Sequence, residues 1–223
     1  MQKLDKARLA VIFDLDGTLL DTIRDYADSM NAALMALGFP VHEVDIYRGY
    51  IGGGVKKSAE RALPEYARNS GNIDKCVDIM KTEYEKRWRI NTKPYPGILK
   101  LLKQLESLKI KLSIVSNKDD ELTKAMVDLL LPPCFVAVKG LVSGILKKPD
   151  PTHAKLCADL MGAEYNRCVF IGDSSIDVET AINAGMTPFV VLWGYQREGH
   201  PFVSNEHKFS TPRELLDFFI KER

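Results

Sequence analysis

The chain has 223 residues, a length that fits one large domain or a core with a smaller insert. With 45% hydrophobic and 27% charged residues, it can bury a sizeable core and should stay in solution. Its formal net charge of +1 gives no overall attraction to nucleic acid or to an anionic membrane, so we expect neither as a partner.

The cysteines and histidines are scattered along the chain and form no C-x-x-C or H-x-x-x-H pair. This spacing favours reduced thiols over a disulfide framework or a zinc site. The stretch MQKLDKARLA at the start lacks the apolar region of a signal peptide, and no apolar run is long enough to span a bilayer. We therefore expect a cytoplasmic protein, and the sequence predicts no particular oligomeric state.

A short apolar run, LAVIF at residues 9–13, suits a strand that is covered on both faces. Similar runs recur, and helical patterns separate them. The later runs are residues 111–115, 134–138, 168–171 and 188–192. The helical patterns are residues 97–108, 121–131, 151–161 and 176–184. Strands that alternate with helices predict an α/β fold with a doubly wound, Rossmann-like, mostly parallel sheet.

One segment breaks this alternation, because no good strand pattern occurs between residues 22 and 95. Its helical patterns are residues 23–37, 55–63 and 73–90, and the chain returns through the turn-rich stretch TKPYPG. We therefore expect two domains. Residues 1–20 and 96–223 would form the Rossmann-like core, and residues 21–95 would form a small helical insert.

Two carboxylates, Asp14 and Asp16, follow the first apolar run within FDLDGTLLDT. Charge beside a core is costly unless a cation, hydrogen bonds or a proton compensates it. Asp16-Gly17 between apolar stretches is also a good hairpin signal, but a hairpin leaves Asp14 unexplained. Side chains two apart at a strand end can point the same way, so a turn and a two-acid site both stay open.

Polar residues follow the second run as Ser116-Asn117-Lys118. This stretch could be a loop that caps the next helix, or it could supply a hydroxyl and main-chain N–H groups that hold an anion. Taken alone, its sequence favours the capping loop. Further on, Lys148 lies in KKPDP. Paired lysines usually mean a solvated surface, but the flanking prolines would fix the direction of Lys148, whose charge could offset the carboxylates and bind phosphate.

A second strand ends in acids in the stretch FIGDSSID, which contains Asp173 and Asp177. Helix capping explains one of these acids, but not a second strand that ends in a carboxylate. In doubly wound sheets, ligands bind outside the carboxyl ends of the strands, which is where all four polar stretches lie. Carboxylates that close repel one another, and Mg²⁺ relieves the conflict through carboxylate, water and phosphate oxygens.

The four stretches FDLDGTLLDT, SIVSN, KKPDP and FIGDSSID, in this order, resemble the motifs of the haloacid dehalogenase superfamily of phosphohydrolases. The resemblance implies that Asp14 is the nucleophile that carries the phosphoryl group, and that Asp16 is the general acid and base. It also implies that Lys148 neutralises charge on Asp14 and on the phosphoryl group.

The remaining roles follow from the same resemblance. Ser116 and main-chain N–H groups near Asn117 would bind the phosphoryl oxygens, and Thr18 would position the turn and its acid. The cofactor would be Mg²⁺. Its ligands would be the carboxylates of Asp14 and Asp173 and the main-chain carbonyl of Asp16, while Asp177 would orient Lys148 or a metal-bound water.

The insert is similar to the small helical cap of this superfamily. Its segment YIGGGVKKSAERAL (residues 50–63) resembles the phosphoglycolate phosphatase branch, which implies that Gly53 and Lys56 contact the substrate. The glycines Gly52 to Gly54 could also serve only as a flexible loop. The presence of Asp16 argues against a dehalogenase, and Thr18 fits a hydrolase better than a sugar-phosphate mutase.

The resemblance implies an Mg²⁺-dependent phosphatase that acts on a small phosphorylated metabolite through an aspartyl-phosphate. Within this reading, 2-phosphoglycolate is the best single substrate. The alternatives are a β-phosphoglucomutase-like phosphomutase and a pyrophosphatase, sugar-phosphate or nucleotide phosphatase of the same superfamily. A receiver-like signalling module that accepts phosphate on Asp14 is a more distant alternative, because such a module lacks a cap and an acid like Asp16.

Overall fold

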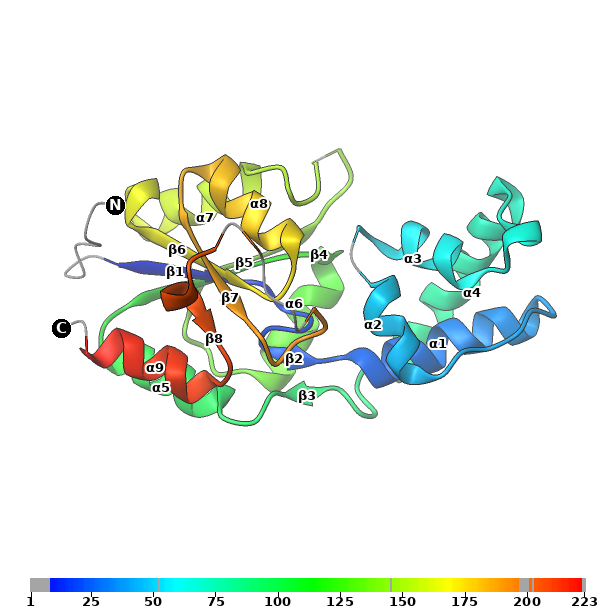
Figure 1. Cartoon of the computed structure of the whole chain (residues 1–223), viewed down its shortest axis with the longest axis horizontal. Coiled ribbons are helices and arrows are strands. Elements are labelled where there is room, and N and C mark those ends of the chain that lie inside the picture. Colours follow the sequence, from blue (N-terminus) through cyan, green and yellow to red (C-terminus); the bar gives the residue numbers. More distant parts are fainter. Residues whose placement is uncertain (1–8, 52, 145, 197–200, 202, 222–223) are drawn as a thin grey trace. The chain divides into compact units, whose positions relative to one another are not determined.

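The computed structural model describes residues 9–51, 53–144, 146–196, 201 and 203–221 (Figure 1). The chain divides into two compact units, Met1–Leu20 with Pro94–Arg223, and Asp21–Lys93. The second unit ends at Lys93, whereas the sequence analysis places the boundary after residue 95. Among the described residues, no helix is both long and apolar enough to cross a membrane.

The first unit, which we call the core unit, contains a six-stranded sheet. Its strands are β1 (Ala10–Phe13), β4 (Lys111–Asp119), β5 (Phe135–Leu141), β6 (Cys168–Gly172), β7 (Thr187–Val191) and β8 (Lys208–Phe209). They lie in the order β5-β4-β1-β6-β7-β8, and every pair is parallel. The order reverses between β1 and β6, so this is the doubly wound arrangement that the alternating pattern predicts, and the predicted fold class is confirmed.

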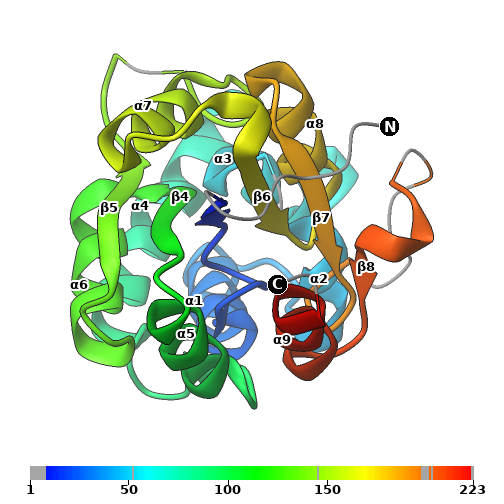
Figure 2. The same cartoon turned by 90° about the vertical axis from the view of Figure 1, so that its left-hand side faces the viewer.

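Helices cover both faces of this sheet (Figure 2). They are α5 (Ile98–Ser107), α6 (Asp120–Leu130), α7 (Thr152–Met161), α8 (Ser175–Ala184) and α9 (Pro212–Lys221). α7 and α8 lie together on one face, where Ala154 and Ala181 pack against Ala10 and Ile12 of β1. Since β1 is buried on both faces, it reads as a continuous apolar run rather than an alternating one.

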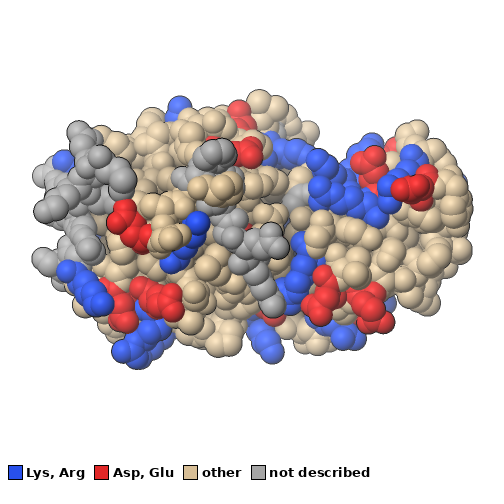
Figure 3. Space-filling model, in the orientation of Figure 1, with Lys and Arg blue, Asp and Glu red and all other residues tan. Residues whose placement is uncertain are grey.

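The second unit, which we call the cap unit, is mainly helical. Its helices are α1 (Ile23–Ala36), α2 (Tyr47–Tyr50), α3 (Val55–Ala62) and α4 (Ser70–Arg87). α1 and α4 are amphipathic and pack on each other, as the 5.9 Å edge-to-face contact of Tyr26 with Tyr84 shows. Figure 3 shows charges of both signs on both units, in keeping with the small net charge.

Four short elements differ from the sequence prediction. β2 (Leu20–Asp21) and β3 (Lys93–Pro94) pair with each other as a separate two-stranded sheet, so the expectation of no strand between residues 22 and 95 is wrong at Lys93–Pro94. Strand β8 and the one-turn helix α2 also have no counterpart in the prediction. Elements of two to four residues are too short to produce a recognisable periodicity, which is why the sequence does not indicate them.

Candidate active site

The strand register brings the polar motifs to one edge of the core sheet. Phe13 at the end of β1 is paired with Ile114 on β4 and with Ile171 on β6. These three residues therefore lie side by side in the sheet, and the polar side chains that come after them in the chain lie at the same edge. The sheet order reverses here between β1 and β6, which is the usual place for a ligand in such folds.

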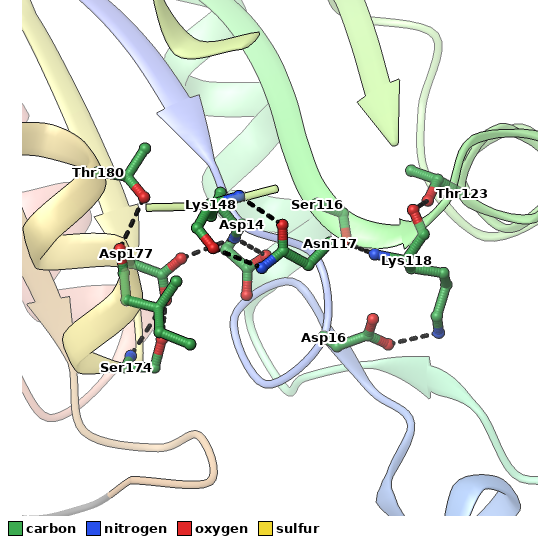
Figure 4. Close-up of polar contacts among 11 residues, drawn as sticks. Asp14, Asp16, Ser116, Asn117, Lys118, Thr123, Lys148, Ser174, Asp177 and Thr180 are labelled. Atoms are coloured by element: carbon green, nitrogen blue, oxygen red, sulfur yellow. Dashed lines mark hydrogen bonds and ion pairs between the residues drawn. The ribbon is translucent and has the colours of Figure 1, made fainter. Parts of the chain in front are cut away.

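Lys148 connects two carboxylates at this edge (Figure 4). Its Nζ lies 2.6 Å from Oδ1 of Asp14 and 2.7 Å from Oδ1 of Asp177, and only 6% of the residue is exposed. Asn117 fixes the main chain of Lys148 with two reciprocal hydrogen bonds. The Lys148 N–H donates to Asn117 Oδ1 (2.7 Å), and Asn117 Nδ2 donates to the Lys148 carbonyl (3.1 Å). Lys148 is thus held both at its main chain and at its ammonium group.

Asp177 both caps the start of α8 and holds Lys148. Its Oδ2 accepts hydrogen bonds from the N–H (3.1 Å) and the hydroxyl (2.6 Å) of Ser174 at the start of α8. Its Oδ1 holds Lys148. Because both oxygens already have donors, this geometry suits a residue that orients Lys148 rather than a direct metal ligand.

Three buried carboxylates, those of Asp14, Asp173 and Asp177, have oxygens within 4.8 Å of one another. Burial raises the pKa of Asp14 well above its usual value, and the neighbouring carboxylates raise it further, against the opposing effect of Lys148. Burial and Asp177 likewise raise the pKa of Asp173 to about 7, although the Tyr195 N–H opposes this shift. These shifts show that the three ionised carboxylates carry more negative charge than Lys148 neutralises.

Lys148 itself stays positively charged in this setting. Burial alone would lower its pKa, but Asp14 and Asp177 outweigh that effect and raise the pKa above its ordinary value. Three carboxylates against one ammonium leave a formal charge of two negative units. A divalent cation would balance this charge, and an all-oxygen donor set is what Mg²⁺ prefers. The residues therefore fit the predicted metal, with Asp14 and Asp173 as the carboxylates available to hold it.

The first loop, Leu15 to Leu20, is a compact turn. Gly17 has a φ of +84°, its N–H donates to Leu20 O (2.9 Å), and Leu20 N–H donates to Leu15 O (2.9 Å). The alternative of a two-stranded hairpin at Asp16-Gly17 is wrong, because β1 pairs with β4 and β6 on its two sides and β2 pairs with β3. The Thr18 hydroxyl is buried and has no hydrogen-bond partner within the described part of the chain.

Lys118 also lies at this edge of the sheet, although its sequence pattern did not mark it as a candidate. Its Nζ lies 2.7 Å from Oδ1 of Asp16, and both side chains are largely buried, with 10% and 19% exposed. The same Nζ lies 3.4 Å from Sδ of Met126 on α6. The Lys118 N–H also donates to Ser116 Oγ (3.1 Å), and Ser116 is 3% exposed. The signal was its position directly after Ser116-Asn117 at the end of β4.

Gly53 and Lys56 belong to the cap unit and are described only within it. Gly53 has a φ of +82°, a backbone conformation that favours glycine. Lys56 on α3 forms an exposed ion pair of 2.8 Å with Asp74 on α4. Gly52, part of the same predicted segment, lies outside the described residues.

Comparisons with known proteins agree with this geometry. The profile of the family described as haloacid dehalogenase-like hydrolase matches residues 11–191. A phosphoglycolate phosphatase of Aquifex aeolicus is 35% identical over 83% of this chain and 85% of its own length. One of Mesorhizobium japonicum is 30% identical over 96% of this chain and 98% of its own.

Solved structures are also similar. A crystal structure from Lactobacillus delbrueckii subsp. bulgaricus, provisionally assigned as a phosphoglycolate phosphatase, has a TM-score of 0.87 at 31% identity. The match covers 94% of this chain and 97% of that chain. A haloacid dehalogenase-like hydrolase from Streptococcus pneumoniae has a TM-score of 0.83 at 23% identity, over 95% of this chain and 98% of that one, and so supports the fold alone. The predicted resemblance is confirmed, and the chain belongs to the family of haloacid dehalogenase-like hydrolases.

Proposed function

We propose that the protein is an Mg²⁺-dependent phosphatase that hydrolyses a small phosphomonoester through an aspartyl-phosphate on Asp14. The observation that carries the proposal is the Lys148 ammonium between Asp14 and Asp177, beside Asp173, where the sheet order reverses. A buried carboxylate held by a buried cation is a suitable nucleophile for phosphorus. The relatives at 35% and 30% identity named as phosphoglycolate phosphatases support the reaction class.

In the first half of the reaction, a carboxylate oxygen of Asp14 attacks phosphorus and the bond from phosphorus to the ester oxygen breaks. Asp16 gives its proton to the departing oxygen, so the product leaves as an alcohol. Lys148 stays protonated and offsets negative charge on Asp14 and on the phosphoryl oxygens. This step needs positioned charges more than further covalent chemistry.

In the second half, the Asp16 carboxylate takes a proton from water as the water oxygen attacks phosphorus. The bond from phosphorus to Asp14 breaks, inorganic phosphate leaves, and both aspartates return to their starting states. Ser116, the main-chain N–H groups near Asn117, and the buried Thr18 hydroxyl are the proposed donors to the phosphoryl oxygens. The unpartnered state of the Thr18 hydroxyl supports such a role.

Asp14, Asp173 and the main-chain carbonyl of Asp16 are the proposed ligands of Mg²⁺. When bound, the ion would neutralise part of the charge on these groups and on the phosphoryl oxygens. The proposed division of labour gives residues 21–95 the role of a cap that selects the substrate, with Gly53 and Lys56 as candidate contacts. The best single substrate is 2-phosphoglycolate, after the named activity of the relatives.

The test is to measure phosphate release from 2-phosphoglycolate and from a panel of sugar phosphates, nucleotides and pyrophosphate. Asp14→Asn removes the attacking charge but keeps the shape of the side chain, so kcat should fall by about three orders of magnitude or more. The thermal unfolding midpoint should change little. Retained turnover in this variant would remove Asp14 as the nucleophile, and isomerisation of a sugar phosphate with little free phosphate would identify a mutase.

A further inference from the structure

Four residues that follow β7, Trp193 to Gln196, contact three parts of the proposed site. The indole Nε1–H of Trp193 donates to the Thr18 carbonyl (3.0 Å), in the first loop. The main-chain N–H of Tyr195 donates to Oδ2 of Asp173 (2.6 Å). The Gln196 side chain accepts a hydrogen bond of 3.3 Å from the Ser175 N–H at the start of α8. All of these residues belong to the core unit.

Gly194 lies at the centre of this segment, where the backbones come closest. A Cβ added at Gly194 would lie 2.3 Å from the Gly17 carbonyl oxygen and 2.4 Å from Cβ and Oδ2 of Asp173. A Cβ added at Gly17 would in turn lie 2.5 Å from Asp173 Oδ2. Gly194 does not have a positive φ. Glycine is therefore needed here because there is no space for a side chain, and not because of the backbone conformation.

These contacts join two groups that the proposed function assigns to the cation. Asp173 supplies a carboxylate, and the carbonyl of Asp16 belongs to the peptide that continues into Gly17. The segment holds Asp173 through Tyr195, holds the Thr18 carbonyl through Trp193, and lies directly against Gly17 at Gly194. Any shift of the segment would therefore change the distance between the two oxygen donors.

We propose that Trp193, Gly194 and Tyr195 form a positioning segment that sets the spacing of the Asp173 carboxylate and the Asp16 carbonyl for Mg²⁺. The inference rests on the metal ligands assigned under the proposed function. Mg²⁺ requires near-ideal octahedral geometry with oxygens at about 2.0–2.1 Å, so displacements of a few tenths of an ångström weaken its binding. Groups that hold ligands in place, without touching the metal, commonly change metal affinity about 10- to 100-fold when they are lost.

The indole of Trp193 offers the cleanest test, because it is only half-buried and its hydrogen bond can be removed without opening the core. Trp193→Phe keeps an aromatic ring but removes the donor to the Thr18 carbonyl. We expect the Mg²⁺ dissociation constant, measured by isothermal titration calorimetry without substrate, to rise about three- to tenfold, the effect of one lost hydrogen bond. Raising the Mg²⁺ concentration should recover most of the activity that the variant loses at limiting Mg²⁺, because a weaker site fills by mass action.

Two further variants separate metal positioning from general packing. Gly194→Ala should raise the Mg²⁺ dissociation constant more than 100-fold, whereas Gly49→Ala, with no atom within 4 Å of the added Cβ, should leave it unchanged. The chain has two tryptophans, so in Trp88→Phe the tryptophan emission comes from Trp193 alone. If the segment contacts the metal ligands as proposed, this emission should change when Mg²⁺ is added. If Gly194→Ala does not fold, Trp193→Phe and the emission measurement still decide the question.

The outcomes distinguish this inference from the proposed function. If the unaltered protein binds Mg²⁺ and Trp193→Phe binds it equally well, with no Mg²⁺-dependent emission change of Trp193, the positioning role is wrong and the proposed function stands. If the unaltered protein does not bind Mg²⁺, both are wrong. A weaker Mg²⁺ affinity with an unchanged unfolding midpoint supports the inference.

Discussion

Both units bury carboxylates, but they compensate the charge in different ways. In the cap unit, Asp25 is 1% exposed, and four donors surround its carboxylate: the N–H and Nδ2 of Asn91 and the N–H and hydroxyl of Thr92, at 2.8–2.9 Å. In the core unit, Asp14 and Asp173 share one ammonium with Asp177 and keep raised pKa values.

This difference separates a structural acid from a functional one. Neutral donors complete the hydrogen bonding of Asp25 and tie α1 to the segment that leaves the unit, so the carboxylate oxygens already have their partners and need no ligand. The core acids repel one another and need a further positive charge. Burial of an acid is therefore not by itself a sign of an active site; the surplus of negative charge is.

The largest expected effect comes from removing divalent cations, which acts on the core acids alone. EDTA should stop phosphate release completely, and added Mg²⁺ should restore it, because the surplus charge at Asp14 and Asp173 then has a partner again. Hydrogen exchange should show Mg²⁺-dependent protection at the ends of β1 and β6 and none around Asp25. Full activity in EDTA would contradict the proposed metal site.

The next effect acts on the cap acid alone. Asp25→Ala leaves the donors of Asn91 and of the buried Thr92 without an acceptor, so the free energy of unfolding should fall by about 3–5 kcal/mol. Urea-induced unfolding measures this change. Asp28→Ala is the matched control on the same helix, since Asp28 makes only a partly exposed ion pair with Arg24, and it should change stability little. Equal losses in the two variants would argue against the structural role of Asp25.

Each unit also contains a Lys–Asp ion pair, and the two pairs differ in burial. Lys118–Asp16 in the core unit is largely buried, whereas Lys56–Asp74 in the cap unit is exposed. If Asp16 protonates the leaving group, Lys118→Met should misplace its carboxylate and lower kcat/KM for 2-phosphoglycolate about 10- to 100-fold. The p-nitrophenyl ester should lose far less, because its leaving group departs without a proton.

Lys118→Arg keeps the charge and should recover part of the activity. The comparison of the two esters is decisive, because a variant that merely disturbs the fold lowers kcat/KM for both. Equal losses on 2-phosphoglycolate and on p-nitrophenyl phosphate would show that Lys118 does not act through Asp16.

The sequence predicts those features that depend on strand ends. Apolar runs and the acids after them indicate a parallel sheet with Asp14 and Asp173 at one edge, because strand direction fixes where those residues lie. The sequence did not predict Lys118, whose direction depends on packing against Met126. It also did not predict the contact between Trp193 and Thr18, which are 175 residues apart and meet only in the folded chain. Asp25 was missed because its donors lie in a different segment, beyond α4.

The smallest expected effect concerns the exposed pair of the cap unit. Lys56→Ala should change the free energy of unfolding by less than about 1 kcal/mol, since exposed ion pairs contribute little. If Lys56 contacts the substrate, this variant should change the ratio of kcat/KM values across the substrate panel a few-fold and leave the rate of aspartyl-phosphate formation at saturation nearly unchanged. Asp74→Ala removes the same ion pair but keeps the lysine, so it should not change the substrate preference. A matching change in Asp74→Ala, or an equal loss on every substrate, would mean that Lys56 acts through the structure of α3 rather than through the ligand.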